Sequence, residues 1–192
     1  MTAARQPVIA ILAVPETSAS VLYGMYDLFR SAGRDWSMAI GGEAGPGLVQ
    51  PVVVATREGS FPIVNEVHVR PETTIDRIGC PDVVVIPDLA VDPGGPFDRD
   101  RFAAEIAWLK DCHARGAVLA SACSGALLFA EAGLLDGYDA TTHWAFADAI
   151  ARRHPRIRMR PENALVVTGE GHRLVMAGGG TSWSDLALYL IS

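Results

Sequence analysis

Cys123 is the side chain in this sequence whose type and surroundings point most directly to chemistry. It stands between a short apolar run, residues 117–120, and a stretch, residues 124–132, whose apolar side chains recur at helical spacing. Small residues flank it on both sides, as a tight strand-to-helix turn requires. At the start of a helix the dipole favours thiolate over thiol. The pattern therefore predicts a nucleophile elbow at Cys123, the alternative being a small, buried, inert thiol.

A thiolate nucleophile needs a base or charged partner, and His143 is the leading candidate. It lies twenty residues beyond Cys123, after a helix and a glycine-containing turn, so the chain can return beside the elbow. The other four histidines fall in polar turns, near a helix end or on an edge strand, and we expect them at the surface. They are His68, His113, His154 and His172.

Two acidic residues follow apolar, strand-like runs. Glu16 comes just after residues 8–14 and Asp88 just after residues 83–86. In an open α/β sheet, ligands bind outside the carboxyl ends of the strands, so both acids should converge with Cys123. We expect Glu16 to hold the thiolate by a hydrogen bond. The alternative is that Glu16 is only an acid at the start of the next helix, where the dipole favours negative charge.

The same edge should supply donors for an oxyanion or a ligand. The backbone N–H of Ser124 would face an oxyanion formed at Cys123, and a second donor is expected from the loop after residue 86. Asp88 and Leu89 are the ligand-binding candidates in that loop, which has no glycine at its start. The sequence offers no metal site and no cofactor motif that we would assign.

Composition limits the possible classes of protein. The chain has 192 residues, of which 49% are hydrophobic, enough for one domain with a substantial core. Its formal net charge is −6, and the one basic cluster, residues 152–160, is expected to be a solvated face without a nucleic-acid role. The three cysteines are far apart in sequence and suggest neither a disulfide framework nor a zinc site. No apolar run is long enough to span a bilayer, and we expect a cytoplasmic protein.

Strand-like and helix-like runs alternate along the chain. The strands are too continuously apolar to have a wet face, which favours an α/β fold with a mostly parallel sheet between two layers of helices. Residues 52–70 read as a small hairpin or a pair of edge strands. The other expected elements are strands at residues 8–14, 36–40, 83–86 and 117–120, helices at residues 21–32, 99–115, 145–153 and 183–191, and a hairpin of residues 165–168 with 174–177.

Two stretches carry a family resemblance. Residues 121–144, from Ser-Ala-Cys-Ser-Gly to Thr-Thr-His-Trp, and residues 176–190 resemble the ThiJ/PfpI superfamily, which has the flavodoxin-like, class I glutamine amidotransferase-like fold. Within it the chain is most similar to the N-terminal domains of AraC-type transcriptional regulators, with isonitrile hydratases a near relation. The resemblance implies that Cys123 occupies the nucleophile position, His143 the histidine position and Glu16 the acid position.

Two departures from the family pattern bear on function. Where many relatives, isonitrile hydratases included, have Leu-Asp-x-x-Gly-Pro in the first helix, residues 20–25 read Ser-Val-Leu-Tyr-Gly-Met. The usual Pro-Gly-Gly after the fourth strand is here Pro-Asp-Leu at residues 87–89. Both departures favour recognition over turnover. The resemblance therefore implies a small-molecule-sensing domain of an AraC-type regulator.

The resemblance also implies partners. We expect a homodimer, and DNA contact only through a helix-turn-helix domain outside residues 1–192, which form one domain. The final helical pattern reaches Ser192 without a stop signal, which suggests a longer natural chain or else a frayed end. Two other functions stay open. One is a cysteine-dependent isonitrile hydratase, amidase or glyoxalase-like enzyme, and the other is a redox sensor in which Cys123 is oxidised to a sulfinate.

Overall fold

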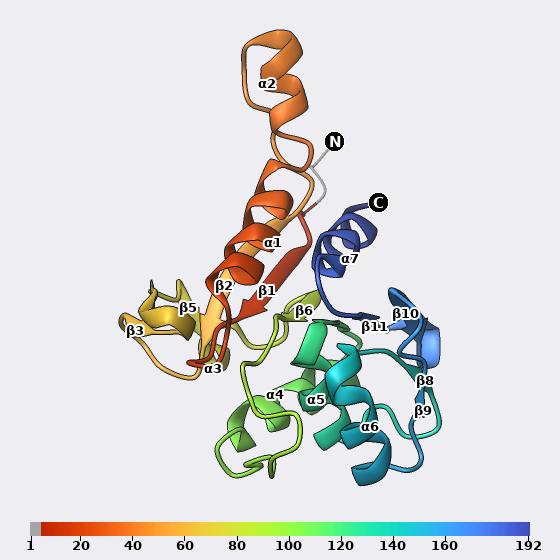
Figure 1. Cartoon of the computed structure of the whole chain (residues 1–192). Coiled ribbons are helices and arrows are strands. Elements are labelled where there is room, and N and C mark those ends of the chain that lie inside the picture. The colour runs from red at the N-terminus through yellow and green to blue at the C-terminus, as the bar shows by residue number, and fades with distance from the viewer. Residues whose placement is uncertain (1–4) are drawn as a thin grey trace.

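A seven-stranded sheet forms the centre of the protein, whose computed structural model describes residues 5–192 (Figure 1). The strand order is β10-β11-β7-β6-β1-β2-β5, and every neighbouring pair is parallel except β10 with β11. The α/β fold with a mostly parallel sheet is thus confirmed. The strands are β1 (Val8–Leu12), β2 (Gln50–Ala55), β5 (Thr73–Thr74), β6 (Val83–Ile86), β7 (Val118–Ala122), β10 (Leu165–Thr168) and β11 (Leu174–Ala177).

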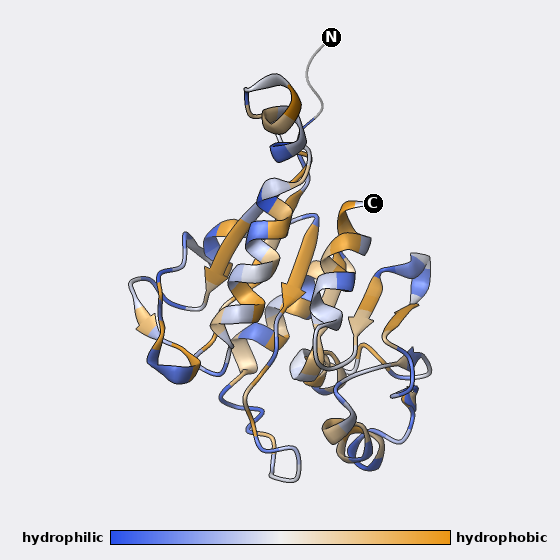
Figure 2. Cartoon of the chain, turned by 45° about the horizontal axis from the view of Figure 1, so that its top comes forward, coloured by the Kyte–Doolittle hydropathy of each residue, from blue (hydrophilic) through white to orange (hydrophobic). Residues whose placement is uncertain are grey.

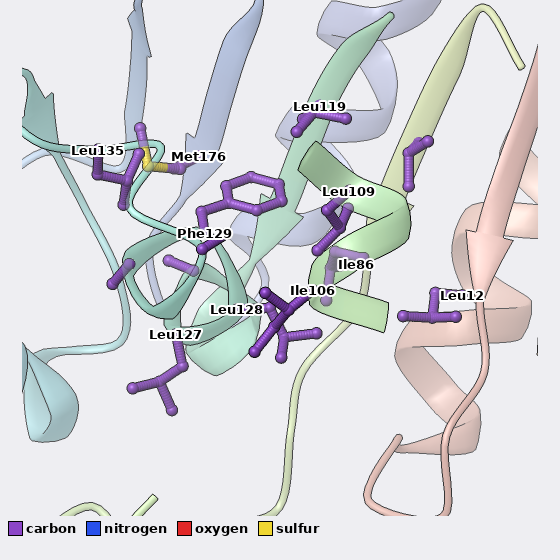
Figure 3. Close-up of a cluster of buried hydrophobic side chains, with 14 of the residues drawn as sticks. Leu12, Ile86, Ile106, Leu109, Leu119, Leu127, Leu128, Phe129, Leu135 and Met176 are labelled. Carbon is purple, nitrogen blue, oxygen red and sulfur yellow. The ribbon is translucent and has the colours of Figure 1, made fainter. Parts of the chain in front are cut away.

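Helices cover both faces of this sheet, because alternate side chains of the strands point to opposite sides. In β1, Ala10 and Leu12 join the cluster under α4, α5 and α6, whereas Ile9 and Ile11 join the cluster under α1 and α7. Figure 3 shows the first cluster, and Figure 2 the apolar strands between the helices. The helices are α1 (Ala19–Ser31), α2 (Asp35–Gly41), α3 (Ile75–Ile78), α4 (Ala103–Ala114), α5 (Ala126–Glu131), α6 (Trp144–Arg153) and α7 (Ser182–Ile191).

Helices α1 and α7 pack closely because α1 has a glycine at their contact. A Cβ atom on Gly24 would lie 2.5 Å from Cη2 of Trp183, so only a residue without a side chain leaves room for the indole. Leu22, Met25 and Phe29 of α1 are buried on the same side of the molecule. The N-terminal and C-terminal helices are therefore fixed against each other on one face of the sheet.

The strand predicted at residues 36–40 is wrong, because this segment is helix α2. Asp35 stands in its first turn and Gly42 ends it in the left-handed conformation, both of which are helix signals. Trp36 and Ile40 are 73% and 70% exposed, so their apolar character does not reflect burial. In Figure 1, α2 stands away from the layers of the domain, beyond the end of α1.

Residues 52–70 are only partly as predicted. β2 is an interior strand, paired in parallel with β1 and with β5, and not an edge strand or half of a hairpin. A small hairpin does follow, formed by β3 (Phe61–Pro62) and β4 (His68–Val69). The predicted hairpin of residues 165–168 with 174–177 is confirmed as β10 and β11.

The remaining elements are short. β8 (Asp139–Ala140) and β9 (Arg158–Met159) form a separate parallel pair, and three 3-10 turns are η1 (Val64–Glu66), η2 (Cys123–Gly125) and η3 (Glu170–His172). Within residues 5–192, no helix combines the length and the apolar character that crossing a membrane requires.

Candidate functional site

Cys123 is the first residue of η2, the sharp turn that connects β7 to α5. Its φ is +53°, a left-handed backbone conformation that is uncommon outside glycine. The turn is held on both sides, because Cys123 N donates to Gly178 O at 3.0 Å and Cys123 O accepts from Thr142 Oγ1 at 2.7 Å. The backbone N–H of His143 donates to the same carbonyl at 3.4 Å. The residues after β11 and before α6 thus fix the conformation of Cys123.

Ser124 ties this turn to the loop that follows β6. Its buried hydroxyl accepts from Leu89 N at 2.7 Å and donates to Leu89 O at 2.8 Å. At Gly125, an added Cβ would collide with Pro87 O, so the two segments approach as closely as a glycine permits. The prediction that this loop offers a second oxyanion donor is wrong for Leu89, because its N–H is already bonded to Ser124.

The Cys123 thiol is stabilised in its neutral form. Burial is the largest influence and raises the pKa of Cys123, and the nearby Asp88 carboxylate raises it further. Hydrogen bonds from the backbone and the side chain of Ser124 act in the opposite direction and lower the pKa, but they do not outweigh burial. The expectation that the helix end makes Cys123 a ready thiolate is therefore wrong in its net direction.

Asp88 is the acid that acts on this thiol. Its carboxylate also accepts hydrogen bonds from Ser18 N, at 3.1 Å, and from Ser18 Oγ. Ser18 is the N-cap of α1, so Asp88 supplies the side-chain acceptor that the first turn of this helix needs. The carboxyl end of β6 and the start of α1 are joined at this point, next to Cys123.

Glu16 follows the carboxyl end of β1, as predicted, but its carboxylate binds Arg101. Its Oε2 accepts from Arg101 Nη2 at 3.0 Å, and its backbone carbonyl accepts from Ala90 N at 2.7 Å. Within residues 5–192, the carboxylate of Glu16 makes its hydrogen bond to Arg101 and none to Cys123. Where we expected a hydrogen bond to the thiol, the Glu16 carboxylate forms an ion pair with Arg101, a side chain that the sequence did not single out.

His143 lies beside the turn and begins α6. Its Nδ1 accepts from Ala145 N at 3.2 Å, so the ring caps the helix. In a neutral imidazole whose Nδ1 is an acceptor, the proton is on Nε2. The ring packs on Gly179, where a Cβ would overlap its Cδ2, and its backbone contacts Cys123. In this arrangement His143 has no free lone pair with which to take a proton from the thiol.

A cavity of about 210 Å³ opens beside the Glu16–Arg101 ion pair. Aromatic and aliphatic side chains make most of its wall, and Cys123 is not among them. Leu127 places the wall on α5, the helix that begins just after Cys123, and Phe146 places it on α6. The lining residues are Glu16, Val91, Asp92, Pro93, Gly95, Pro96, Phe97, Asp98, Arg101, Phe102, Leu127, Phe146 and Arg153.

Two arginines in the cavity wall, Arg101 and Arg153, form ion pairs with nearby carboxylates. Arg101 lies between two carboxylates, Glu16 at 3.0 Å and Glu105 at 3.6 Å, and Glu105 is only 1% exposed. Arg153 donates to Gly95 O at 3.1 Å and pairs with Glu131 at 3.3 Å, which joins the loop over the cavity to α5. The sequence signal for Arg101 was its spacing of four residues from Glu105, a common helical ion pair.

The remaining histidines divide into two groups. His68 and His172 are exposed, as predicted. His154 and His113 are only partly exposed, so their predicted surface position holds only in part. His154 Nε2 lies 3.1 Å from Glu131 Oε1, and burial lowers the pKa of His113. The basic residues 152–160 do form a largely exposed face, on which Asp139 binds Arg158 and Arg160.

Known proteins resemble this chain in sequence and in fold. An HTH-type transcriptional regulator, CdhR of Pseudomonas aeruginosa, is 37% identical over 89 residues, which are 46% of this chain and 25% of the regulator. The isonitrile hydratase of Pseudomonas putida is 32% identical over 123 residues, 64% of this chain and 50% of the hydratase. The matched stretches thus span half or less of these relatives.

The fold is shared with an AraC family transcriptional regulator from Pseudomonas putida. That structure has a TM-score of 0.71 at 17% identity and aligns over 97% of this chain and 91% of its own. The strongest assignment comes from the sequence profile of the DJ-1/PfpI family, which matches residues 11–190. Since this match includes the sheet, the turn at Cys123 and the helices on both faces, the chain belongs to the DJ-1/PfpI family.

Proposed function

We propose that this chain is the ligand-binding domain of an AraC-type transcriptional regulator and that its small-molecule ligand binds in the cavity beside Glu16 and Arg101. The observation that carries the proposal is the cavity itself. It combines an apolar, aromatic wall with the Glu16–Arg101 pair, the usual composition of a small-molecule site. The similarity to HTH-type regulators supports the regulatory role. DNA binding falls to a separate domain, and the domain acts as a homodimer.

The state of Cys123 also favours recognition over turnover. A nucleophilic mechanism needs a thiolate and a base, whereas burial raises the pKa of this thiol and His143 Nδ1 is engaged in capping α6. A ligand in the cavity contacts Phe102, the N-cap of α4, together with α5, α6 and the loop of residues 91–98. Binding there therefore changes the free energy of several elements that a DNA-binding domain could sense.

Thermal unfolding of the purified chain with a panel of small nitrogenous compounds tests the proposal. A ligand should raise the melting temperature, and Arg101→Met should abolish that shift because it removes the charge facing Glu16 while keeping an aliphatic stem. Cys123→Ala should retain the shift. Arg77→Met, which removes a surface pair with Glu58, is the matched control for loss of an arginine.

A cysteine-dependent enzyme is the second candidate, favoured by the left-handed turn at Cys123 and by the backbone of Ser124, which lowers the pKa of the Cys123 thiol. Turnover of an isonitrile or a 2-oxoaldehyde that is lost in Cys123→Ala and kept in Arg101→Met would establish it and reject the sensor. Redox sensing through Cys123 is a third candidate. It requires that mild peroxide convert Cys123 to the sulfinate before Cys80 and Cys112 react, which mass spectrometry measures.

A further inference from the structure

The other two cysteines meet near the amino ends of β6 and β7, whereas Cys123 follows the carboxyl end of β7. Cys80 lies between α3 and the start of β6, and Cys112 lies in the last turn of α4. Although 32 positions separate them, Cys80 Sγ donates to Cys112 O at 3.7 Å. Cys112 Sγ in turn donates to Gly79 O, the carbonyl next to Cys80, at 3.8 Å. The fold thus brings together two thiols that are remote in sequence, and both are free.

The two thiols differ in their access to solvent. Cys112 is 0% exposed. Cys80 is only partly buried and lines an open hollow of about 270 Å³ together with Asp82, Arg115 and Gly116. A reagent in solution can therefore reach Cys80 before Cys112, and a mixed disulfide formed on Cys80 would lie beside Cys112.

We propose that Cys80 and Cys112 are a reversible disulfide-forming pair whose oxidant is a small-molecule disulfide of the glutathione type. Cys80 loses its proton to solvent and its sulfur attacks the small disulfide, forming a mixed disulfide and releasing one thiol. Cys112 then attacks the Cys80 sulfur, the bond from Cys80 to the small molecule breaks, and the departing sulfur takes up the Cys112 proton, which forms the protein disulfide and releases the second thiol. In sum, one small disulfide is reduced to two thiols as two protein thiols become one disulfide.

Electrostatics support this division of roles. Burial, and next the neighbouring Cys80, raise the pKa of Cys112 to about 12. A thiol with so high a pKa carries very little thiolate, so Cys112 does not take the first step. Once Cys80 is held in a mixed disulfide it carries no charge, and its part of the increase in the pKa of Cys112 is removed before the second step. Neither cysteine lines the cavity, so the proposal does not rest on the sensing function.

The experiment titrates the purified chain in buffers of glutathione and glutathione disulfide, quenches with an alkylating reagent in denaturant so that buried thiols also react, and counts free thiols by mass spectrometry. We expect the count to fall from three to one, with Cys80 and Cys112 lost together and Cys123 still alkylated. Peptide mapping should show one link, between the peptides that contain Cys80 and Cys112, and dithiothreitol should restore all three thiols. The oxidised chain should also melt at a higher temperature, since the link closes a loop.

Three variants complete the test. Cys123→Ser should still form the link, whereas Cys80→Ala should lose it and show no increase in melting temperature on oxidation. Cys112→Ala should stop at the mixed disulfide on Cys80, and if this buried substitution prevents folding, Cys80→Ala alone decides the matter. The proposal is overturned if the only products are mixed disulfides in the unmutated chain, links between molecules, or links that involve Cys123.

Discussion

The rate at which Cys123 is alkylated reports how burial and the Asp88 carboxylate together set the pKa of its thiol. Burial raises the pKa of this thiol most and the Asp88 carboxylate raises it next, so removing the Asp88 charge should lower the pKa. In Asp88→Asn we therefore expect Cys123 to alkylate faster at neutral pH, because more thiolate is present. The asparagine can still accept a hydrogen bond from the N-cap of α1, which keeps that helix start intact.

Alkylation with iodoacetamide, followed by mass spectrometry across a pH series, gives the measurement. The midpoint of the rate profile should shift to lower pH in Asp88→Asn. Asp76→Asn, at an exposed position of α3, is the matched control and should leave the midpoint unchanged. An unaltered midpoint in Asp88→Asn would show that the carboxylate charge does not reach the sulfur.

How much of the site the sequence could predict depends on how local each residue's role is. The small residues around Cys123 and the apolar run before it predicted its place in the turn, because these signals lie within a few residues. The roles of Glu16 and Leu89 could not be predicted in this way. They depend on Arg101 and Ser124, which are 85 and 35 positions away and are placed only by the complete fold.

At the scale of the elements, the contact of α1 with α7 predicts that a glycine-to-alanine substitution in a helix lowers stability, where such a substitution usually raises it. Replacing an exposed helical glycine by alanine stabilises a protein by about 1 kcal/mol. At Gly24 the added Cβ would lie 2.5 Å from the Trp183 ring, so we expect Gly24→Ala to lower the free energy of unfolding by about 1–3 kcal/mol through overpacking.

Urea denaturation compares this variant with Gly41→Ala. Gly41 is the last residue of α2 and has no atom near its added Cβ, so this control should be neutral or stabilising. Trp183→Leu in the Gly24→Ala background should recover part of the loss by making room. Equal changes at Gly24 and Gly41 would contradict the close contact of the two helices.

Helix α4 carries a buried acid whose charge destabilises the folded chain. Burial raises the pKa of Glu105 above its ordinary value of 4.5, and Arg101 offsets this only in part. The folded state thus binds this proton more tightly than the unfolded state, and stability falls as pH rises from the ordinary to the raised pKa. Glu105→Gln should be more stable than the unmutated chain above that window.

Urea denaturation between pH 4 and pH 8 tests the sign. The advantage of Glu105→Gln should be absent at the low end and grow through the window, by about 1.4 kcal/mol for each tenfold difference in proton affinity. Glu162→Gln, at an exposed position, should show no such trend. An advantage that is independent of pH would point to packing and not to charge.

At the scale of the whole molecule, the sheet divides the core in two. Phe29 belongs to the cluster under α1 and α7, and Phe129 to the cluster under α4, α5 and α6. Because the two side chains belong to separate clusters on opposite faces of the sheet, the effects of substituting them should add. We expect Phe29→Leu with Phe129→Leu to change the free energy of unfolding by the sum of the single effects, within about 0.5 kcal/mol.

A double-mutant cycle by urea denaturation measures this sum. The matched pair on one face is Phe29→Leu with Met25→Val, two buried residues one turn apart on α1, which should deviate from additivity. If Phe29→Leu with Phe129→Leu deviates from additivity as strongly as the pair on one face, the two clusters are energetically coupled through the sheet.

The overall architecture could be predicted because the apolar runs were long and repeated. Strands such as β6, which are buried on both faces, require helices on both sides, and this requirement alone predicted the layers. The same logic failed for α2, where Trp36, Met38 and Ile40 are apolar yet exposed. It also failed for β2, whose interior place in the sheet follows from its pairing with β1 and β5 and not from its own pattern.

Helix α4 has one end at the cavity and the other at the thiol pair. Phe102, its N-cap, lines the cavity, and Cys112 lies in its last turn. A helix of 12 residues is a stiff element about 18 Å long. Thermodynamic reciprocity then relates ligand binding in the cavity to oxidation of the thiol pair. If occupation of the cavity changes the midpoint potential of the Cys80–Cys112 couple, oxidation of that couple must change the ligand's dissociation constant by the equivalent free energy.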